Sequence, residues 1–316
     1  MVCCNFACIS IRWSYALAVA SRPLEPAEPA TESLDEWLHS LLPHGGLGTQ
    51  GRAVFQRLRA DPGHASHAPA SEIAEMAGAS VSSVTRTAQR LGFQGWPRLQ
   101  AELRSRYLAR LSLVDIAASH GDTQTPFGDA LRNDQRALAE SARSIDEAQI
   151  LRIAQRIAAA ENIYVTAQGS YAAVGLALAH NIGIAGYPVR PLLNEPAALS
   201  NAVSRMGPAD VLIVCSYWRI YDVAVIAAQL ASNRGTGVVL LADSLPYALR
   251  TVADEVVIAA AEGTSFFPSL TAATAVQQGI VATLASLNPA RTQEAMKAAE
   301  QAWQDFKLLH LGPSRS

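Results

Sequence analysis

Hydroxyl-bearing residues recur where short apolar runs end in the second half of the chain. Hydroxyl groups, a nearby carboxylate and the forked guanidinium of arginine are groups that bind phosphate oxygens and sugar hydroxyls. The candidate ligand-binding residues at these positions are Gly169, Ser170, Ser216, Arg219, Tyr221, Asp243, Ser244 and Ser265. They favour a polyol or sugar-phosphate ligand, although a plain turn at Gly169-Ser170 and an aromatic plug around Tyr221 are alternative interpretations. No glycine-rich nucleotide-binding motif is present, and we expect no cofactor, no metal and no catalytic residue.

A parallel sheet would bring these positions together. From Asn162 onward, short β-rich runs alternate with helical segments, which predicts an α/β fold with a doubly wound parallel sheet. The predicted strands are Ile163–Ala167, Pro188–Pro191, Val211–Cys215, Gly237–Ala242 and Glu255–Ala259. Ligands of such sheets bind beyond the carboxyl ends of the strands, where the candidate residues follow.

A different pattern occupies residues 69–93. Two short amphipathic helices are predicted there, and Gly78 can take the left-handed conformation that ends the first of them. Ser80 is placed to cap the second helix, and Gly92 to end it. Two short helices joined by a turn that contains glycine are typical of the helix-turn-helix.

The second of these helices is predicted to carry polar groups suited to phosphates and base edges in a DNA major groove. The candidate DNA-binding residues are Ser80, Ser82, Ser83, Thr85, Arg86, Gln89 and Arg90. Residues 50–110 hold nine arginines against four acidic residues, a net charge of +5, whereas the rest of the chain carries −7. This separation of charge favours a DNA-binding module on an acidic body. An ordinary helical bundle with a solvated polar face is the alternative.

The whole composition sets limits on both interpretations. The chain has 316 residues with 16% charged side chains and a net charge of −2, which indicates about two globular domains and argues against a uniformly basic protein. No apolar run approaches the length of a membrane span. Cys3, Cys4 and Cys8 have no further partner at a zinc-like spacing. The first 32 residues lack the basic start of a signal peptide and are rich in proline towards their end, so we expect a disordered tail.

Further helices are expected before the sheet, at 34–42, 50–60, 96–110, 127–141 and 146–160. The first would be capped by Ser33 with Glu36 three residues on.

Two blocks of sequence resemble one known family. Residues 74–80, Arg86 and residues 91–96 resemble the N-terminal domain of RpiR-family transcriptional regulators, and the α/β region resembles their SIS domain, a phosphosugar-binding fold. Within the second block, Gly169-Ser170, residues 210–221, Asp243-Ser244 and Ala253-Asp254 follow the family's order, and the resemblance runs from Leu34 to Leu309.

The resemblance implies a cytoplasmic bacterial regulator, a homodimer or homotetramer, that binds double-stranded operator DNA and a phosphorylated sugar. It places Ser80, Ser83 and Arg86 on or beside the recognition helix. One loop departs from the family's Ser-x-Ser-Gly-x-Thr pattern, because Trp218, Arg219 and Tyr221 replace the second Ser, the Gly and the Thr. Either Arg219 takes over phosphate binding from backbone amides, or the ligand is not a simple sugar phosphate.

The predicted organisation has a disordered tail (1–32), a helix-turn-helix domain (33–112), a linker (113–126), an SIS domain (127–310) and a C-terminal tail (311–316). Its predicted function is regulation of a carbohydrate-related operon in response to the ligand of the SIS domain, without enzymatic activity. Two alternatives stay open: a sugar-phosphate isomerase, for which His180 and Glu195 make a poor acid–base pair, and a regulatory partner that does not bind DNA.

Overall fold

The computed structural model of the chain describes residues 33–108, 110–119, 124–245, 249, 251–264 and 266–308. The predicted tails at 1–32 and 311–316 therefore lie outside the described residues. The molecule divides into two compact units, residues 1–40 and 41–316. No helix in the described part of the chain is long and apolar enough to cross a membrane.

The first unit contributes helix α1 (Leu34–Ser40). The Ser33 hydroxyl accepts the N–H of Glu36 at 3.0 Å, and the Glu36 carboxylate accepts the N–H of Ser33 at 2.5 Å. These two bonds satisfy amides that have no partner within the helix. The predicted cap is confirmed, and the helix ends two residues earlier than expected.

The second unit begins with a helical region. Its helices are α2 (Thr49–Ala60), α3 (Pro62–Ala65), α4 (Ala70–Met76), α5 (Val81–Arg90), α6 (Trp96–Leu108) and α7 (Leu113–Ser119). α5 contacts α2, α4 and α6. Val84, Ala88 and Leu91 are buried at spacings of four and three residues, so the predicted apolar stripe of α5 is confirmed.

Helix α7 corrects one expectation. The segment is predicted as a mixed linker, yet a helix forms because Ser112 and Asp115 build a second reciprocal cap. The Ser112 hydroxyl accepts the Asp115 N–H at 3.1 Å, and the Asp115 carboxylate accepts the Ser112 N–H at 3.2 Å. Ile116 is 1% exposed, so this helix also contributes to a core. The proposed domain boundaries stay predictions.

The described residues of the α/β region form five strands in the order β2-β1-β3-β4-β5, all parallel. They are β1 (Asn162–Ala167), β2 (Val189–Leu193), β3 (Asp210–Ser216), β4 (Gly237–Ala242) and β5 (Glu255–Ile258). The helices of this region are α8 (Pro126–Ser144), α9 (Glu147–Ala159), the 3-10 turn η1 (Gly169–Tyr171), α10 (Ala172–Ile184), α11 (Pro196–Val203), α12 (Asp222–Ser232), α13 (Thr271–Leu287) and α14 (Pro289–Asp305). The predicted α/β class and parallel sheet are confirmed.

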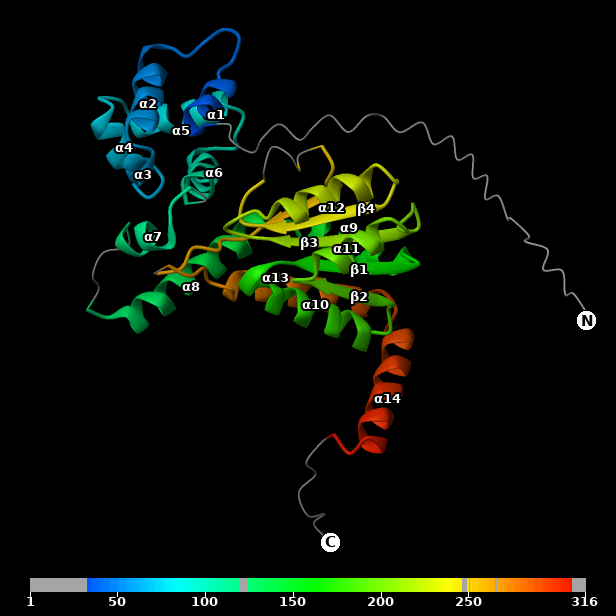
Figure 1. The fold of residues 1–316 in the computed structure, drawn as a ribbon. Helices are drawn as coiled ribbons and strands as arrows, with labels where there is room; N and C mark the ends of the chain where they lie inside the picture. Colours follow the sequence, from blue (N-terminus) through cyan, green and yellow to red (C-terminus); the bar gives the residue numbers. More distant parts are fainter. Residues whose placement is uncertain are drawn as a thin grey trace, which may run out of the picture. The chain divides into compact units, whose positions relative to one another are not determined.

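Helices cover both faces of the sheet (Figure 1), and an apolar core lies between the sheet and the helices on each face. Val211, Ile213 and Cys215 of β3 face a core that includes residues of α9, α10 and α13, whereas Leu212 and Val214 face α11 and α12. This alternation follows from the two-residue period of a strand, and burial on both faces is why β3 is apolar throughout. Because all strands are parallel, their carboxyl ends meet at one edge.

Candidate functional site

Helix α5 has a well-defined start. Gly78 has φ +59°, and no atom lies within 4 Å of the position that a Cβ would take. Glycine is therefore favoured here because of the left-handed backbone conformation and not because space is short. The Ser80 hydroxyl then accepts the N–H of Ser83 at 3.2 Å and caps the helix. Both predictions about this turn are confirmed.

The outer face of α5 carries most of the predicted DNA-binding residues. Ser80, Ser82, Arg86, Gln89 and Arg90 are exposed, and Thr85 is half-buried. The face therefore offers hydroxyl, amide and guanidinium groups to a binding partner, the groups that contact phosphates and base edges.

Ser83 differs from the expectation that it is exposed. It is 5% exposed, and its hydroxyl donates to Gln50 Oε1 of α2 at 2.5 Å while accepting from Arg86 Nη2 at 3.1 Å. A serine at this position of the stripe lies next to α2, where a buried hydroxyl needs partners within the protein. Ser83 therefore positions Arg86 and is not itself placed to contact DNA.

The carboxyl edge of the sheet contains buried polar atoms for which the described residues provide no hydrogen-bond partner. They are Ser216 Oγ and Tyr217 OH at the end of β3, Arg219 Nε in the loop that follows, and Gln168 Nε2 at the end of β1. Ser216 is 6% exposed and Tyr217 3%. Burying such groups without a partner costs about 1–3 kcal/mol each, so a polar ligand at the β1–β3 boundary would recover this free energy. Strand order reverses at that boundary, which is where ligands of such sheets bind.

The predicted loop after β1 has a tight turn. Gly169 has φ +62°, and its N–H donates to Asn194 Oδ1 at 2.9 Å. A Cβ at Gly169 would lie 2.8 Å from the Tyr221 hydroxyl, so the loops after β1 and β3 touch here. Ser170 is exposed beside this contact. Asn194 has φ +54° and is a residue that the sequence pattern did not reveal. Asparagine is one of the few residues other than glycine that readily adopt this left-handed conformation.

Asp243 is a desolvated carboxyl group at the same edge. Burial raises the pKa of Asp243 to about 6, partly opposed by the hydrogen bond from the backbone N–H of Trp218. Trp218 has φ +63°, a costly conformation for a bulky residue. Burial also raises the pKa of Tyr171 and of Tyr217, whose rings stack with centroids 4.4 Å apart.

Two of the predicted ligand-binding residues contact the helical region. The Ser244 hydroxyl donates to Ser105 Oγ of α6 at 2.7 Å. Arg219 donates from Nη2 to the Leu111 carbonyl oxygen, and its guanidinium lies over the Trp218 ring at 5.0 Å. Ser265 lies outside the described residues.

The remaining candidates for chemistry lie on different elements. His180 and Glu195 are exposed, on α10 and just before α11. Cys215 is buried inside β3, and burial raises the pKa of its thiol to about 12, which disfavours the reactive thiolate.

Comparisons with known proteins agree with both parts of this description. Residues 45–110 match the helix-turn-helix domain of the rpiR family. The sugar isomerase domain of an RpiR transcription factor from Sphaerobacter thermophilus is similar at a TM-score of 0.54 and 25% identity, over 56% of this chain and 99% of that one. The NanR protein of Vibrio vulnificus, solved in complex with ManNAc-6P, is similar at a TM-score of 0.54 and 19% identity, over 88% of this chain and all of that one. The second likeness concerns the fold alone.

Proposed function

We propose that this chain, a member of the RpiR family by its helix-turn-helix domain and its SIS-type fold, regulates transcription of a carbohydrate-related operon in response to a phosphorylated sugar or related metabolite. The observation that carries the proposal is α5, a capped helix with Arg86, Gln89 and Arg90 exposed along it within a region of net charge +5. These side chains suit guanine and adenine edges and phosphates.

In this proposal α5 is the recognition helix, and Ser80, Ser82, Thr85, Arg86, Gln89 and Arg90 contact DNA. A homodimer or homotetramer would present two such helices to half-sites about 34 Å apart or a multiple of that distance. A regulator of this kind works in the cytoplasm, where the operator is accessible.

The effector would bind at the carboxyl edge of the sheet. Ser216, Tyr217 and Gln168 offer buried polar atoms without protein partners in the described structure, which supports a ligand rich in oxygen acceptors. Gly169, Ser170, Arg219, Tyr221, Asp243 and Ser244 complete the proposed site. Arg219 already donates from Nη2 to the Leu111 carbonyl oxygen, which leaves fewer of its N–H groups available for a phosphate than the sequence suggests.

The first experiment measures binding of the full-length protein to DNA from upstream of its own gene, by fluorescence anisotropy at two salt concentrations. We expect selective binding that weakens steeply with salt. Arg86→Ala should lower affinity about tenfold or more, in line with the ~1–3 kcal/mol of a bidentate base contact. Arg86→Lys should retain more affinity and lose sequence selectivity, because lysine keeps the charge without the fork.

The control is Arg234→Ala, which removes an exposed arginine after α12 and should leave DNA binding unchanged. Unaltered affinity of a folded Arg86→Ala protein would contradict the role of α5. If a selection from genomic DNA also finds no site, the proposed function fails. Sugar phosphates that release DNA in the same assay identify the effector, whereas turnover of one of them would indicate an isomerase.

A further inference from the structure

Helix α6 contacts the same sheet edge that we propose as the effector site. The Glu102 carboxylate accepts the N–H of Leu245, just after β4, at 3.1 Å. One turn along the helix, Ser105 accepts the hydroxyl of Ser244 at 2.7 Å. The helical region thus uses two polar groups of the β4 exit that a ligand could otherwise use.

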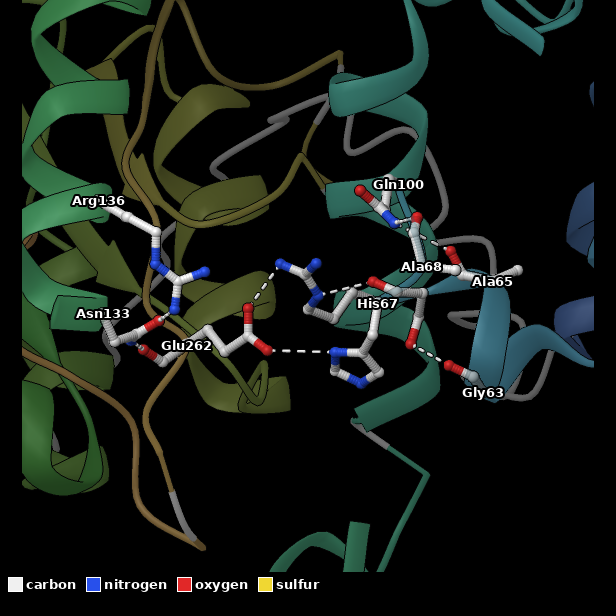
Figure 2. Close-up of polar contacts among 10 residues, drawn as sticks. Gly63, Ala65, His67, Ala68, Gln100, Asn133, Arg136 and Glu262 are labelled. Atoms are coloured by element: carbon white, nitrogen blue, oxygen red, sulfur yellow. Dashed lines mark hydrogen bonds and ion pairs between the residues drawn. The ribbon is translucent and has the colours of Figure 1, made fainter. Parts of the chain in front are cut away.

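A second contact joins α6 to the loop after β5. The Glu262 carboxylate pairs with Arg104 at 2.7 Å and with His67 at 3.2 Å, as Figure 2 shows for Glu262 and His67. The backbone oxygen of Glu262 also accepts from Asn133 Nδ2 of α8 at 2.5 Å, which holds the loop to the α/β region. Both contacts join the helical region to the α/β region. In the first the carboxylate belongs to Glu102 of α6, whereas in the second it belongs to Glu262 of the α/β region.

The chemistry at Glu102 is that of a bound anion. Glu102 is 5% exposed, and its carboxylate takes a backbone N–H from Leu245 and a guanidinium N–H from Arg106 at 3.0 Å. Backbone amides at strand ends, serine hydroxyls and arginine are also the donors that bind phosphate. A phosphate at the β4 exit would need the Leu245 N–H and the Ser244 hydroxyl, which α6 now occupies.

We propose that Glu102 is an internal ligand of the effector site, and that the anionic group of the effector binds by displacing Glu102 from the Leu245 N–H and Ser105 from the Ser244 hydroxyl. The inference rests on the proposed function and adds how that site is regulated. Displacement would release α6, which packs directly on α5, so effector binding and helix placement become linked. By reciprocity, DNA that favours the docked α6 would weaken effector binding by the same factor.

Calorimetric titration of the full-length protein with inorganic phosphate, at constant ionic strength, tests the competition directly. Glu102→Gln weakens the internal acceptor and should raise phosphate affinity about tenfold. Glu300→Gln is the matched control, since it removes the same charge from an exposed position on α14 and leaves α6 and the β4 exit unchanged; it should alter affinity less than twofold. No increase for Glu102→Gln, or an equal increase in both variants, would overturn the proposal.

A crosslink provides a test that does not depend on the stability of Glu102→Gln. With Cys3, Cys4 and Cys8 replaced by serine, Ser105→Cys combined with Ser244→Cys places two thiols where hydroxyl oxygens now lie 2.7 Å apart. The oxidised protein should bind phosphate at least tenfold more weakly than the reduced one, and equal affinities would overturn the proposal. Because these readouts use no DNA, they are independent of the operator-binding experiment, whose failure would remove the regulatory function alone.

Discussion

At the scale of single residues, the β3 exit combines two costly features. Trp218 is in the left-handed region, where a bulky side chain costs about 1–3 kcal/mol, and its N–H donates to the half-buried carboxyl group of Asp243, whose charged form burial disfavours. The hydrogen bond offsets part of both costs, because it gives the Asp243 carboxyl group a donor and fixes the backbone orientation of Trp218. Such pairs persist where a loop must keep one shape, and here the loop bounds the proposed effector site.

The pKa of Asp243 gives this arrangement a measurable pH dependence. A carboxyl group with a folded pKa of about 6 binds protons more tightly in the folded than in the unfolded chain, where its pKa is about 3.9, so its contribution to stability falls as pH rises between these values. Asp243→Asn should therefore raise the free energy of unfolding at pH 8 by about 2 kcal/mol. The gain should shrink towards pH 5.

Urea unfolding of both proteins at pH 5, 6 and 8 measures the difference. Asp305→Asn, an exposed change on α14, is the control and should show no such trend. A gain that grows as pH falls would refute the assignment.

At the scale of elements, the helix-turn-helix depends on one left-handed residue. Gly78→Ala adds a methyl group where no atom lies within 4 Å, so its whole cost is conformational, about 1–2 kcal/mol. Gly45 is the matched control, because its surroundings are equally open and its backbone is outside the left-handed region. Urea unfolding should show the loss for Gly78→Ala and little change for Gly45→Ala. Equal losses would mean that the turn conformation is not what Gly78 provides.

Local rules predicted most elements of this chain. Helix caps, glycine stops and the change of period from helical to strand-like identified α1, α2, α5 and the five strands to within a few residues, because each depends on neighbours in sequence. Helix α7 was missed, since the nearby breakers suggested a linker and its stabilisation includes the burial of Ile116.

The site was less predictable than the elements. The face of α5 followed from helical spacing, except that Ser83 lies against Gln50, 33 residues earlier. Asn194 contacts Gly169 only because β1 and β2 are neighbours in the sheet. No local pattern contains the contacts of Glu102, Ser105 and Arg104, which depend on tertiary structure.

At the scale of the whole molecule, the ion pair of Arg104 and Glu262 joins the helical region to the sheet edge. Both side chains are about one quarter exposed, so reversing either charge should weaken the contact without unfolding a core. We expect Arg104→Glu and Glu262→Arg each to reduce effector-induced release of DNA severalfold, and the double variant to restore most of it. Anisotropy titrations with and without effector measure this coupling, and a double variant no better than the singles would exclude a direct pairwise role.

The contacts between α6 and the sheet edge also have a consequence for how the protein is made. Ser105 and Ser244 are 139 residues apart, and Glu102 and Leu245 are 143 apart. A ribosome therefore completes the helical region long before it adds the residues that hold α6. During that interval the nascent chain carries its basic helical region without the sheet edge that holds α6, so the contacts proposed to regulate the molecule form only late in translation.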